Sequence, residues 1–155
     1  MDFTSKEDID SPIADVFEAL SDFESFERSA IRRGIDVQRI GDISTPENGL
    51  AWDAKFSFRG KARELRITLK SYDPVTRILL SGDSRGLNGE TAIELLALSP
   101  RRTRMSVQLK LAPTTLTGRL LVQSLKLARS NLTRRFKLRL ADYARITEER
   151  LNRSA

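Results

Sequence analysis

The sequence contains no cysteine and no histidine among its 155 residues. Without cysteine, the chain can form neither a disulfide framework nor a thiolate metal site. Without histidine, it lacks the commonest general base, proton shuttle and metal ligand of proteins. The sequence therefore predicts no metal site and no cofactor, and it offers no evident catalytic residue.

Long apolar runs are also missing. No run of about 18 apolar residues occurs, which argues against a membrane-spanning helix. The first ten residues, MDFTSKEDID, are acidic and polar, whereas a signal peptide begins with a basic segment and an apolar core. We therefore expect a cytoplasmic protein.

What is present fits one domain over residues 1–155, with 39% apolar and 31% charged residues. The net charge of +6 is unevenly distributed. Residues 114–155 contain ten Lys or Arg against three Asp or Glu, which gives +7 and leaves −1 for the rest of the chain. Any functional role of the basic charge is therefore local to the C-terminal segment.

Two short helices are predicted directly after an N-terminal strand at residues 2–9. Ser11 is a favoured N-cap and Pro12 suits the first helical position. Asp22 can cap the second helix, and Gly34 can end it. The apolar faces comprise Ile13, Val16, Phe17 and Leu20 in the first helix and Phe23, Phe26 and Ala30 in the second.

The segment after Gly34 alternates between apolar and polar residues, which is typical of strands with one buried face. The clearest alternation covers residues 50–59, with Gly60 as the turn of a hairpin. Further strands are predicted at 61–72, 76–82, 90–99 and 102–112, with a glycine loop containing Gly82, Gly86 and Gly89. Short turns between successive strands indicate an antiparallel meander of about six strands.

The C-terminal segment returns to helical spacing from about Thr115, for more than thirty residues. One continuous apolar stripe comprises Leu121, Leu125, Ala128, Leu132, Phe136, Leu140 and Tyr143. A second set of leucines, Leu116, Leu120, Leu127 and Leu138, lies on roughly the opposite side. Three explanations for this second set remain open: a bend in the helix, a homodimer through the leucines, or contact with an anionic membrane. Nucleic acid is a less favoured partner, because the segment lacks interleaved aromatic residues and any known binding motif.

The order of strand, two short helices, about six antiparallel strands and one long helix resembles the helix-grip fold of the START-like, or SRPBCC, superfamily. The most characteristic stretch is IDSPIADVFEALSDFESF, in which a strand meets proline and then a helix containing Val-Phe. The resemblance implies an α+β fold in which a curved antiparallel sheet wraps around a long C-terminal helix. It also implies a cavity for an apolar small molecule.

The candidate site lies on the inner face of the predicted sheet and on the first part of the C-terminal helix. Arg63 shares the alternating face with the apolar residues and could bind a carboxylate or phosphate as a planar fork. The competing interpretation is that the apolar side chains simply pack against the helix. The candidate ligand-binding residues are Trp52, Phe56, Phe58, Arg63, Leu65, Ile67, Met105, Val107, Leu121 and Leu125.

We therefore expect the binding or transport of a hydrophobic small molecule, such as a lipid, an isoprenoid or an aromatic polyketide-like compound. An alternative is a cyclase or dehydratase-like enzyme of the same superfamily, in which acid–base work would fall to Asp, Glu, Tyr72, Tyr143 or Arg63. A third is a module that docks on a membrane or a partner through the basic helix.

Overall fold

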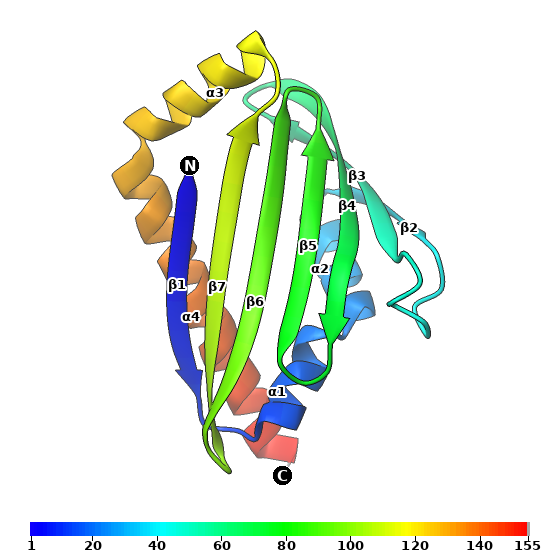
Figure 1. The fold of residues 1–155 in the computed structure, drawn as a ribbon, viewed down its shortest axis with the longest axis vertical. Helices are drawn as coiled ribbons and strands as arrows, with labels where there is room; N and C mark the ends of the chain where they lie inside the picture. Colours follow the sequence, from blue (N-terminus) through cyan, green and yellow to red (C-terminus); the bar gives the residue numbers. More distant parts are fainter. Residues whose placement is uncertain (155) are drawn as a thin grey trace.

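A strongly curved sheet of seven antiparallel strands forms one layer, and four helices lie on its inner side or at its ends (Figure 1). This computed structural model describes residues 1–154. The strand order is β1-β7-β6-β5-β4-β3-β2. The elements are β1 (Asp2–Ile9), α1 (Ile13–Leu20), α2 (Phe23–Arg32), β2 (Asp36–Ile40), β3 (Ala51–Phe58), β4 (Lys61–Asp73), β5 (Arg77–Ser84), β6 (Leu87–Ser99), β7 (Arg102–Pro113), α3 (Leu116–Leu127) and α4 (Arg129–Ser154). The α+β helix-grip architecture is confirmed.

Strands β2 to β7 form a continuous meander, as the alternation predicted. The turn between β3 and β4 consists of Arg59 and Gly60, whose φ angles of 53° and 75° suit a tight two-residue hairpin. Strand β1 joins the far edge of the sheet by pairing with β7, so that Phe3 lies opposite Leu109. One edge of the sheet is therefore formed by the first strand of the sequence, paired with the last.

The predicted glycine loop between β5 and β6 is wrong. The two strands continue through it, and Gly82 pairs with Gly89 across the ladder. Only Gly86, with φ of 85°, belongs to the turn, next to Arg85. Glycine is a strong turn signal in a sequence, but here two of the three glycines are strand residues that leave the inner face of the sheet without side chains.

The two short helices are confirmed, with one correction at the first. Helix α1 begins at Ile13 with Pro12 in the N-cap position, so Ser11 is not the cap. Ser11 is instead buried, and its carbonyl oxygen accepts a hydrogen bond of 2.8 Å from the Thr103 hydroxyl. Asp22 caps α2 as predicted, accepting a hydrogen bond from the backbone N–H of Ser25.

The predicted long C-terminal helix is in fact two helices, α3 and α4, which meet at Ala128. Neither proline nor glycine marks the break. Its physical cause is tertiary: α3 packs against β7, whereas α4 changes direction and packs against β1 (Figure 1). Phe3 and Phe136 are in contact there, with ring centroids 5.8 Å apart.

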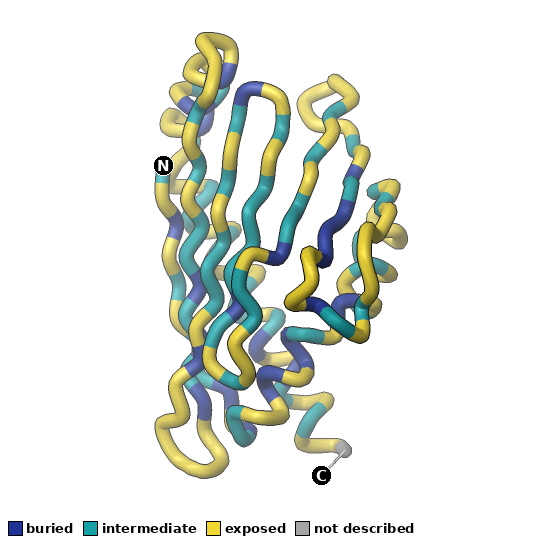
Figure 2. The backbone as a smooth tube through the Cα atoms, turned by 45° about the vertical axis from the view of Figure 1, so that its right-hand side comes forward, coloured by how far each residue is buried: buried dark blue, intermediate teal, exposed yellow. Residues whose placement is uncertain are grey.

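The main apolar stripe of the two helices faces inward, and its residues are buried or half-buried. Figure 2 shows buried and exposed positions alternating along α3, at the top of the molecule. The second set of leucines is exposed despite the change of direction, at 75% for Leu116, 61% for Leu120, 93% for Leu127 and 58% for Leu138. A bend alone therefore does not bury these side chains. Within residues 1–154, no helix is both long and apolar enough to cross a membrane.

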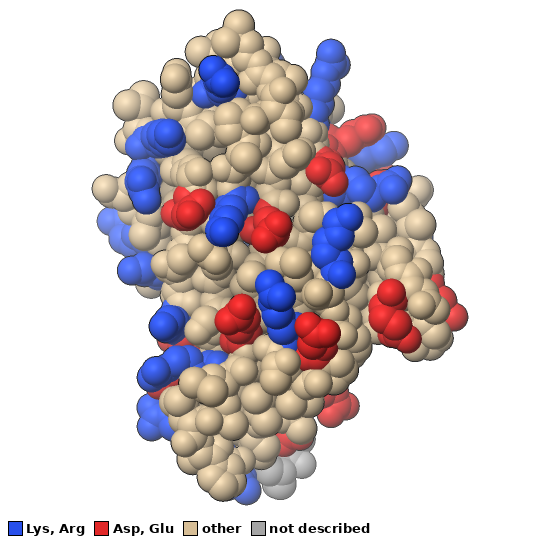
Figure 3. All heavy atoms as spheres, in the orientation of Figure 1, with Lys and Arg blue, Asp and Glu red and all other residues tan. Residues whose placement is uncertain are grey.

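The outward face of the sheet carries acidic and basic side chains intermixed, while Lys and Arg gather along the left-hand edge in Figure 3. Several of these charges form ion pairs between neighbouring strands. Arg66 pairs with Asp53, and Arg104 pairs with Asp8 at 2.9 Å. This face is a solvated surface in which arginines are matched by carboxylates.

Candidate ligand-binding site

The inner face of the sheet borders two adjoining cavities. The first, which we call the α2 lobe, has a volume of about 460 Å³ and lies between α2 and strands β2 to β6. The second, the α3 lobe, has a volume of about 380 Å³ and lies between α3 and strands β3 to β7. The lobes share the wall residues Phe56, Leu65, Ile67 and Leu80. Volumes of this size are typical of small-molecule sites.

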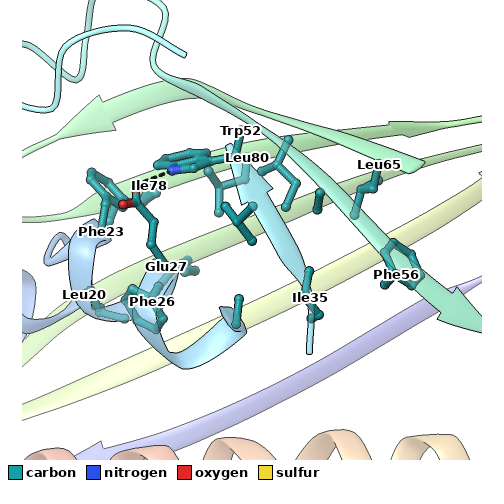
Figure 4. Close-up of a pocket in the computed structure, with 15 residues that line it drawn as sticks. Leu20, Phe23, Phe26, Glu27, Ile35, Trp52, Phe56, Leu65, Ile78 and Leu80 are labelled. Atoms are coloured by element: carbon teal, nitrogen blue, oxygen red, sulfur yellow. Dashed lines mark hydrogen bonds between the residues drawn. The ribbon is translucent and has the colours of Figure 1, made fainter. Parts of the chain in front are cut away.

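The walls of the α2 lobe are almost entirely apolar (Figure 4). Helix α2 supplies Phe23 and Phe26 from the side opposite the sheet, and Trp52 lies across from them on β3. The Phe23 and Trp52 ring centroids are 5.3 Å apart, which fixes both rings in the wall. The amphipathic spacing of α2 thus builds one side of a cavity rather than only a packed interface.

Glu27 is the one charged residue among those that line the α2 lobe. Its side chain is 15% exposed, and its two carboxylate oxygens accept hydrogen bonds of 2.7 Å each from Nε and Nη2 of Arg39. One of them also accepts a hydrogen bond of 2.8 Å from Trp52 Nε1. The carboxylate therefore holds a planar guanidinium and an indole at fixed positions beside the cavity.

These contacts keep Glu27 ionised. The hydrogen bond from Arg39 is the main cause that lowers the pKa of Glu27, and the hydrogen bond from Trp52 acts in the same direction, against desolvation. A carboxylate with a lowered pKa and both oxygens engaged is a poor proton donor at neutral pH. Its evident role is to position Trp52 and α2.

The α3 lobe has room because of the paired glycines. A Cβ atom on Gly82 would lie 3.3 Å from Leu65 Cδ1, and one on Gly89 would lie 3.3 Å from Leu111 Cδ2. Neither glycine needs a positive φ angle, so neither is required by the backbone. Because these two glycines have no side chains, space remains between the sheet and Leu121 and Leu125 of α3, which cover this lobe.

Basic residues line the outer rim of the α3 lobe. The guanidinium carbons of Arg59 and Arg63 each lie 5.4 Å from the centroid of the Phe58 ring, within cation–π distance. Arg59 also donates a hydrogen bond of 2.6 Å to the Ser124 hydroxyl of α3. Arg63 lines the lobe together with Arg85 from the neighbouring hairpin turn.

Eight of the ten predicted site residues line one or both lobes. They are Trp52, Phe56, Phe58, Arg63, Leu65, Ile67, Leu121 and Leu125. Met105 and Val107 line neither lobe, because both are buried in the apolar core, in a cluster that includes Ala144 of α4. For these two residues the structure favours the competing interpretation, packing beneath the helix.

The sequence prediction missed the α2 side of the site. The sequence pattern identifies Phe23 and Phe26 only as part of an apolar helix face, and it gives no reason to distinguish Glu27. The partners of Glu27 lie 12 and 25 residues away in sequence, so no local pattern could have identified the cluster. The wall residues Leu80, Ile93 and Leu109 follow from the same strand alternation that identified Trp52.

Of the other named acid–base candidates, Arg63 lines the α3 lobe, whereas Tyr72 and Tyr143 line neither lobe. Burial raises the pKa of the Tyr143 hydroxyl. The Tyr143 ring stacks against Phe26 with centroids 5.9 Å apart, so it lies behind the wall rather than in it. Among residues 1–154, no group of three or more Asp, Glu, His or Cys side chains is placed to hold a metal ion.

Comparisons with known proteins show the fold. No family model and no curated protein matches the sequence. An aromatase/cyclase, Zhui, from Streptomyces sp. R1128 superposes with a TM-score of 0.67 at 12% identity, covering 100% of this chain and 96% of the other. The protein TTHA0849 from Thermus thermophilus gives 0.66 at 13% identity, covering 100% and 99%. A START superfamily protein from Mycobacterium smegmatis gives 0.53 at 14%, covering 86% and 95%. The chain thus has the START-like helix-grip fold.

Proposed function

We propose that residues 1–155 form a single domain that binds a hydrophobic small molecule in the α2 and α3 lobes. The observation that supports this is the α2 lobe, a cavity of about 460 Å³ whose apolar walls contain one charged group with its hydrogen bonds already made. Such a cavity gains free energy by covering apolar surface of a ligand. Lipids, isoprenoids and aromatic polyketide-like compounds have the required chemistry.

The proposal favours a carrier over a cyclase or dehydratase. A catalyst would need an acid or base whose pKa is tuned toward neutrality and which reaches the substrate. Glu27, the carboxylate in the wall, has its pKa shifted the other way. Tyr143, whose pKa is raised, lies outside the wall.

This function is tested by native mass spectrometry of protein purified without detergent. Any retained compound is then extracted and identified. We expect a discrete added mass, or saturable quenching of Trp52 fluorescence by a broad panel of apolar compounds. The variant Leu80→Trp places a large side chain in a wall shared by both lobes, and it should abolish binding. Leu79→Trp is the matched control, because Leu79 lies next to it on the other face of β5. Absence of any bound compound across the panel would refute the function.

We also propose that α3 docks on an anionic membrane surface, a second function favoured by its outer face. Leu116, Leu120 and Leu127 fall within about 40° of one another on a helix with 3.6 residues per turn, so they form one exposed stripe. Residues 116–141, which comprise α3 and the first half of α4, contain seven Lys or Arg and no Asp or Glu; two of the seven lie in α3 and five in α4. Exposed leucines beside unmatched positive charge are the pattern of helices that lie on anionic lipid.

Co-sedimentation with vesicles tests the docking function. Binding should require phosphatidylglycerol, weaken with added salt, and be lost in Leu120→Ser/Leu127→Ser. The matched control is Leu96→Ser/Leu98→Ser, which removes two exposed leucines of β6 instead. Binding that does not depend on lipid charge would refute docking on an anionic membrane. A native mass of two chains that is lost in the α3 variant alone would also refute it, and would show that a second copy of the chain covers this stripe.

A further inference from the structure

The arginines at the rim of the α3 lobe differ from those on the outward face of the sheet. On the outward face, Arg66, Arg77 and Arg104 each form an ion pair with a carboxylate of a neighbouring strand. At the rim, Arg63 donates a hydrogen bond of 3.5 Å to the Phe58 carbonyl oxygen and lies over the Phe58 ring, but it forms no ion pair within the described residues. Arg85 has no ion pair or hydrogen bond within the same residues. These three arginines are thus paired with carboxylates, whereas Arg63 and Arg85 at the cavity are not.

No carboxylate is available at the rim to balance this charge. The hairpin segment 58–63 reads FRGKAR, with three basic residues and no acidic one. None of the residues that line the α3 lobe is Asp or Glu. The acidic residues nearest in sequence to the two arginines, Glu64 and Asp83, point to the outward face. Glu64 pairs with Lys55 at 4.0 Å, and Asp83 lies opposite Arg66 in the ladder.

The guanidinium of Arg63 is placed where it can bind a ligand inside the α3 lobe. It lies on the same face of β4 as Leu65 and Ile67, and its side chain is half-buried. The Phe58 ring keeps its guanidinium within 5.4 Å of the ring centroid, which holds the planar fork near the cavity. Guanidinium groups with free donors bind carboxylate, sulfate and phosphate in a bidentate manner.

We infer that the ligand is an anionic amphiphile whose head group binds between Arg63 and Arg85, with its apolar body running through the α3 lobe toward Trp52. This inference rests on the proposed ligand-binding function. The direction follows from the geometry of the walls: Arg63 lies opposite Phe56, and Phe56 is four residues from Trp52 along β3, about 13 Å at the usual strand rise. The far end of the α2 lobe offers only the occupied carboxylate of Glu27.

The test compares three probes with the same alkyl chain and different heads: laurate and dodecyltrimethylammonium, each below its micelle concentration, and dodecanol below its solubility limit. Trp52 fluorescence reports binding. We expect laurate to bind about tenfold more tightly than dodecanol, and the cation more weakly than either. In Arg63→Gln/Arg85→Gln, laurate should fall to the affinity of dodecanol, while dodecanol binding stays unchanged. Arg59 is kept because it holds α3 through Ser124.

The control Arg101→Gln/Lys110→Gln removes the same amount of charge away from both lobes and should retain the preference for laurate. Equal affinities of the wild type for laurate and dodecanol would overturn this inference and leave the proposed function standing. A laurate preference that survives in Arg63→Gln/Arg85→Gln would overturn the assignment to these arginines. Failure of all three probes to bind would overturn the inference together with the proposed function.

A pair of brominated laurates tests the direction of the ligand. Bromine at the terminal carbon should quench Trp52 more strongly than bromine next to the carboxylate, since the head lies at the rim and the tail approaches the indole. The reverse order would place the head group beside Glu27 and refute the inferred orientation.

Discussion

Substitution of Glu27 by glutamine should destabilise the protein measurably, because this side chain connects α2 to β2 and β3. In the wild type, its carboxylate accepts two hydrogen bonds from Arg39 and one from Trp52, and it is 15% exposed. A glutamine keeps one acceptor oxygen but loses the charge and the bidentate geometry. Loss of charge-assisted bonds at such a site costs about 2 kcal/mol.

For a chain of this length, that cost lowers the melting temperature by about 4–8 °C. Asp53→Asn is the matched control, because Asp53 forms the same kind of pair with Arg66 but on the solvated face, with side-chain exposures of 41% and 51%. Screening by water makes such a pair worth less, so its melting temperature should change less. Differential scanning fluorimetry at pH 7 measures both variants side by side.

The pH dependence of the difference identifies the ionised carboxylate as its cause. The pKa of Glu27 is lowered in the folded state, so its contribution to stability is complete above the ordinary glutamate value of about 4.3 and is lost as the pH falls through the lower folded value. The gap between wild type and Glu27→Gln, measured by urea unfolding, should therefore shrink in acid. A gap that stays constant down to pH 3, or equal losses in both variants at pH 7, would refute this account of the Glu27 cluster.

Three further predictions concern packing. Gly118→Ala would place a Cβ atom 1.8 Å from the Gly86 carbonyl oxygen, so α3 should detach and its amides should exchange hydrogen faster, while those of α4 stay protected; an unchanged exchange pattern would contradict this. Gly89→Leu should fill part of the α3 lobe and shorten the longest alkyl chain that titrates Trp52, and an unaltered chain-length limit would show that ligands do not enter there. Thr103→Val removes a buried hydrogen bond to the chain preceding α1 and should cost about 1–2 kcal/mol in urea unfolding; a neutral result would mean that this carbonyl is satisfied in another way.

The alternation of strand residues predicted most of the fold and the sheet side of the site. An inward-pointing residue is usually apolar whether it lines a cavity or packs beneath a helix, so Trp52 and Met105 look alike in sequence. Which of them borders open space depends on where α4 crosses the sheet. That crossing is set by the break at Ala128, which tertiary packing imposes on a segment of uniform helical spacing.

The roles of the glycines and of the charged residues were harder to predict from the sequence. Gly82 and Gly89 are strand residues whose lack of side chains leaves space for the α3 lobe, although a glycine-rich segment is typical of a loop. The Glu27 cluster joins side chains from α2, β2 and β3, and the rim arginines join two separate hairpins. Contacts of this kind depend on register between distant strands, which a single sequence does not encode in any local pattern.

The pairing of β1 with β7 has a consequence for biosynthesis. Asp2 lies opposite Lys110, so the first strand has no partner until more than one hundred further residues have left the ribosome. Strands β2 to β6 can form their hairpins earlier, because each pairs with its neighbour in sequence. The nascent chain therefore spends most of its synthesis with β1 unpaired and with the part of the inner face beneath α3 and α4 uncovered. A chaperone, or the ligand itself, would be most useful to the chain in that interval.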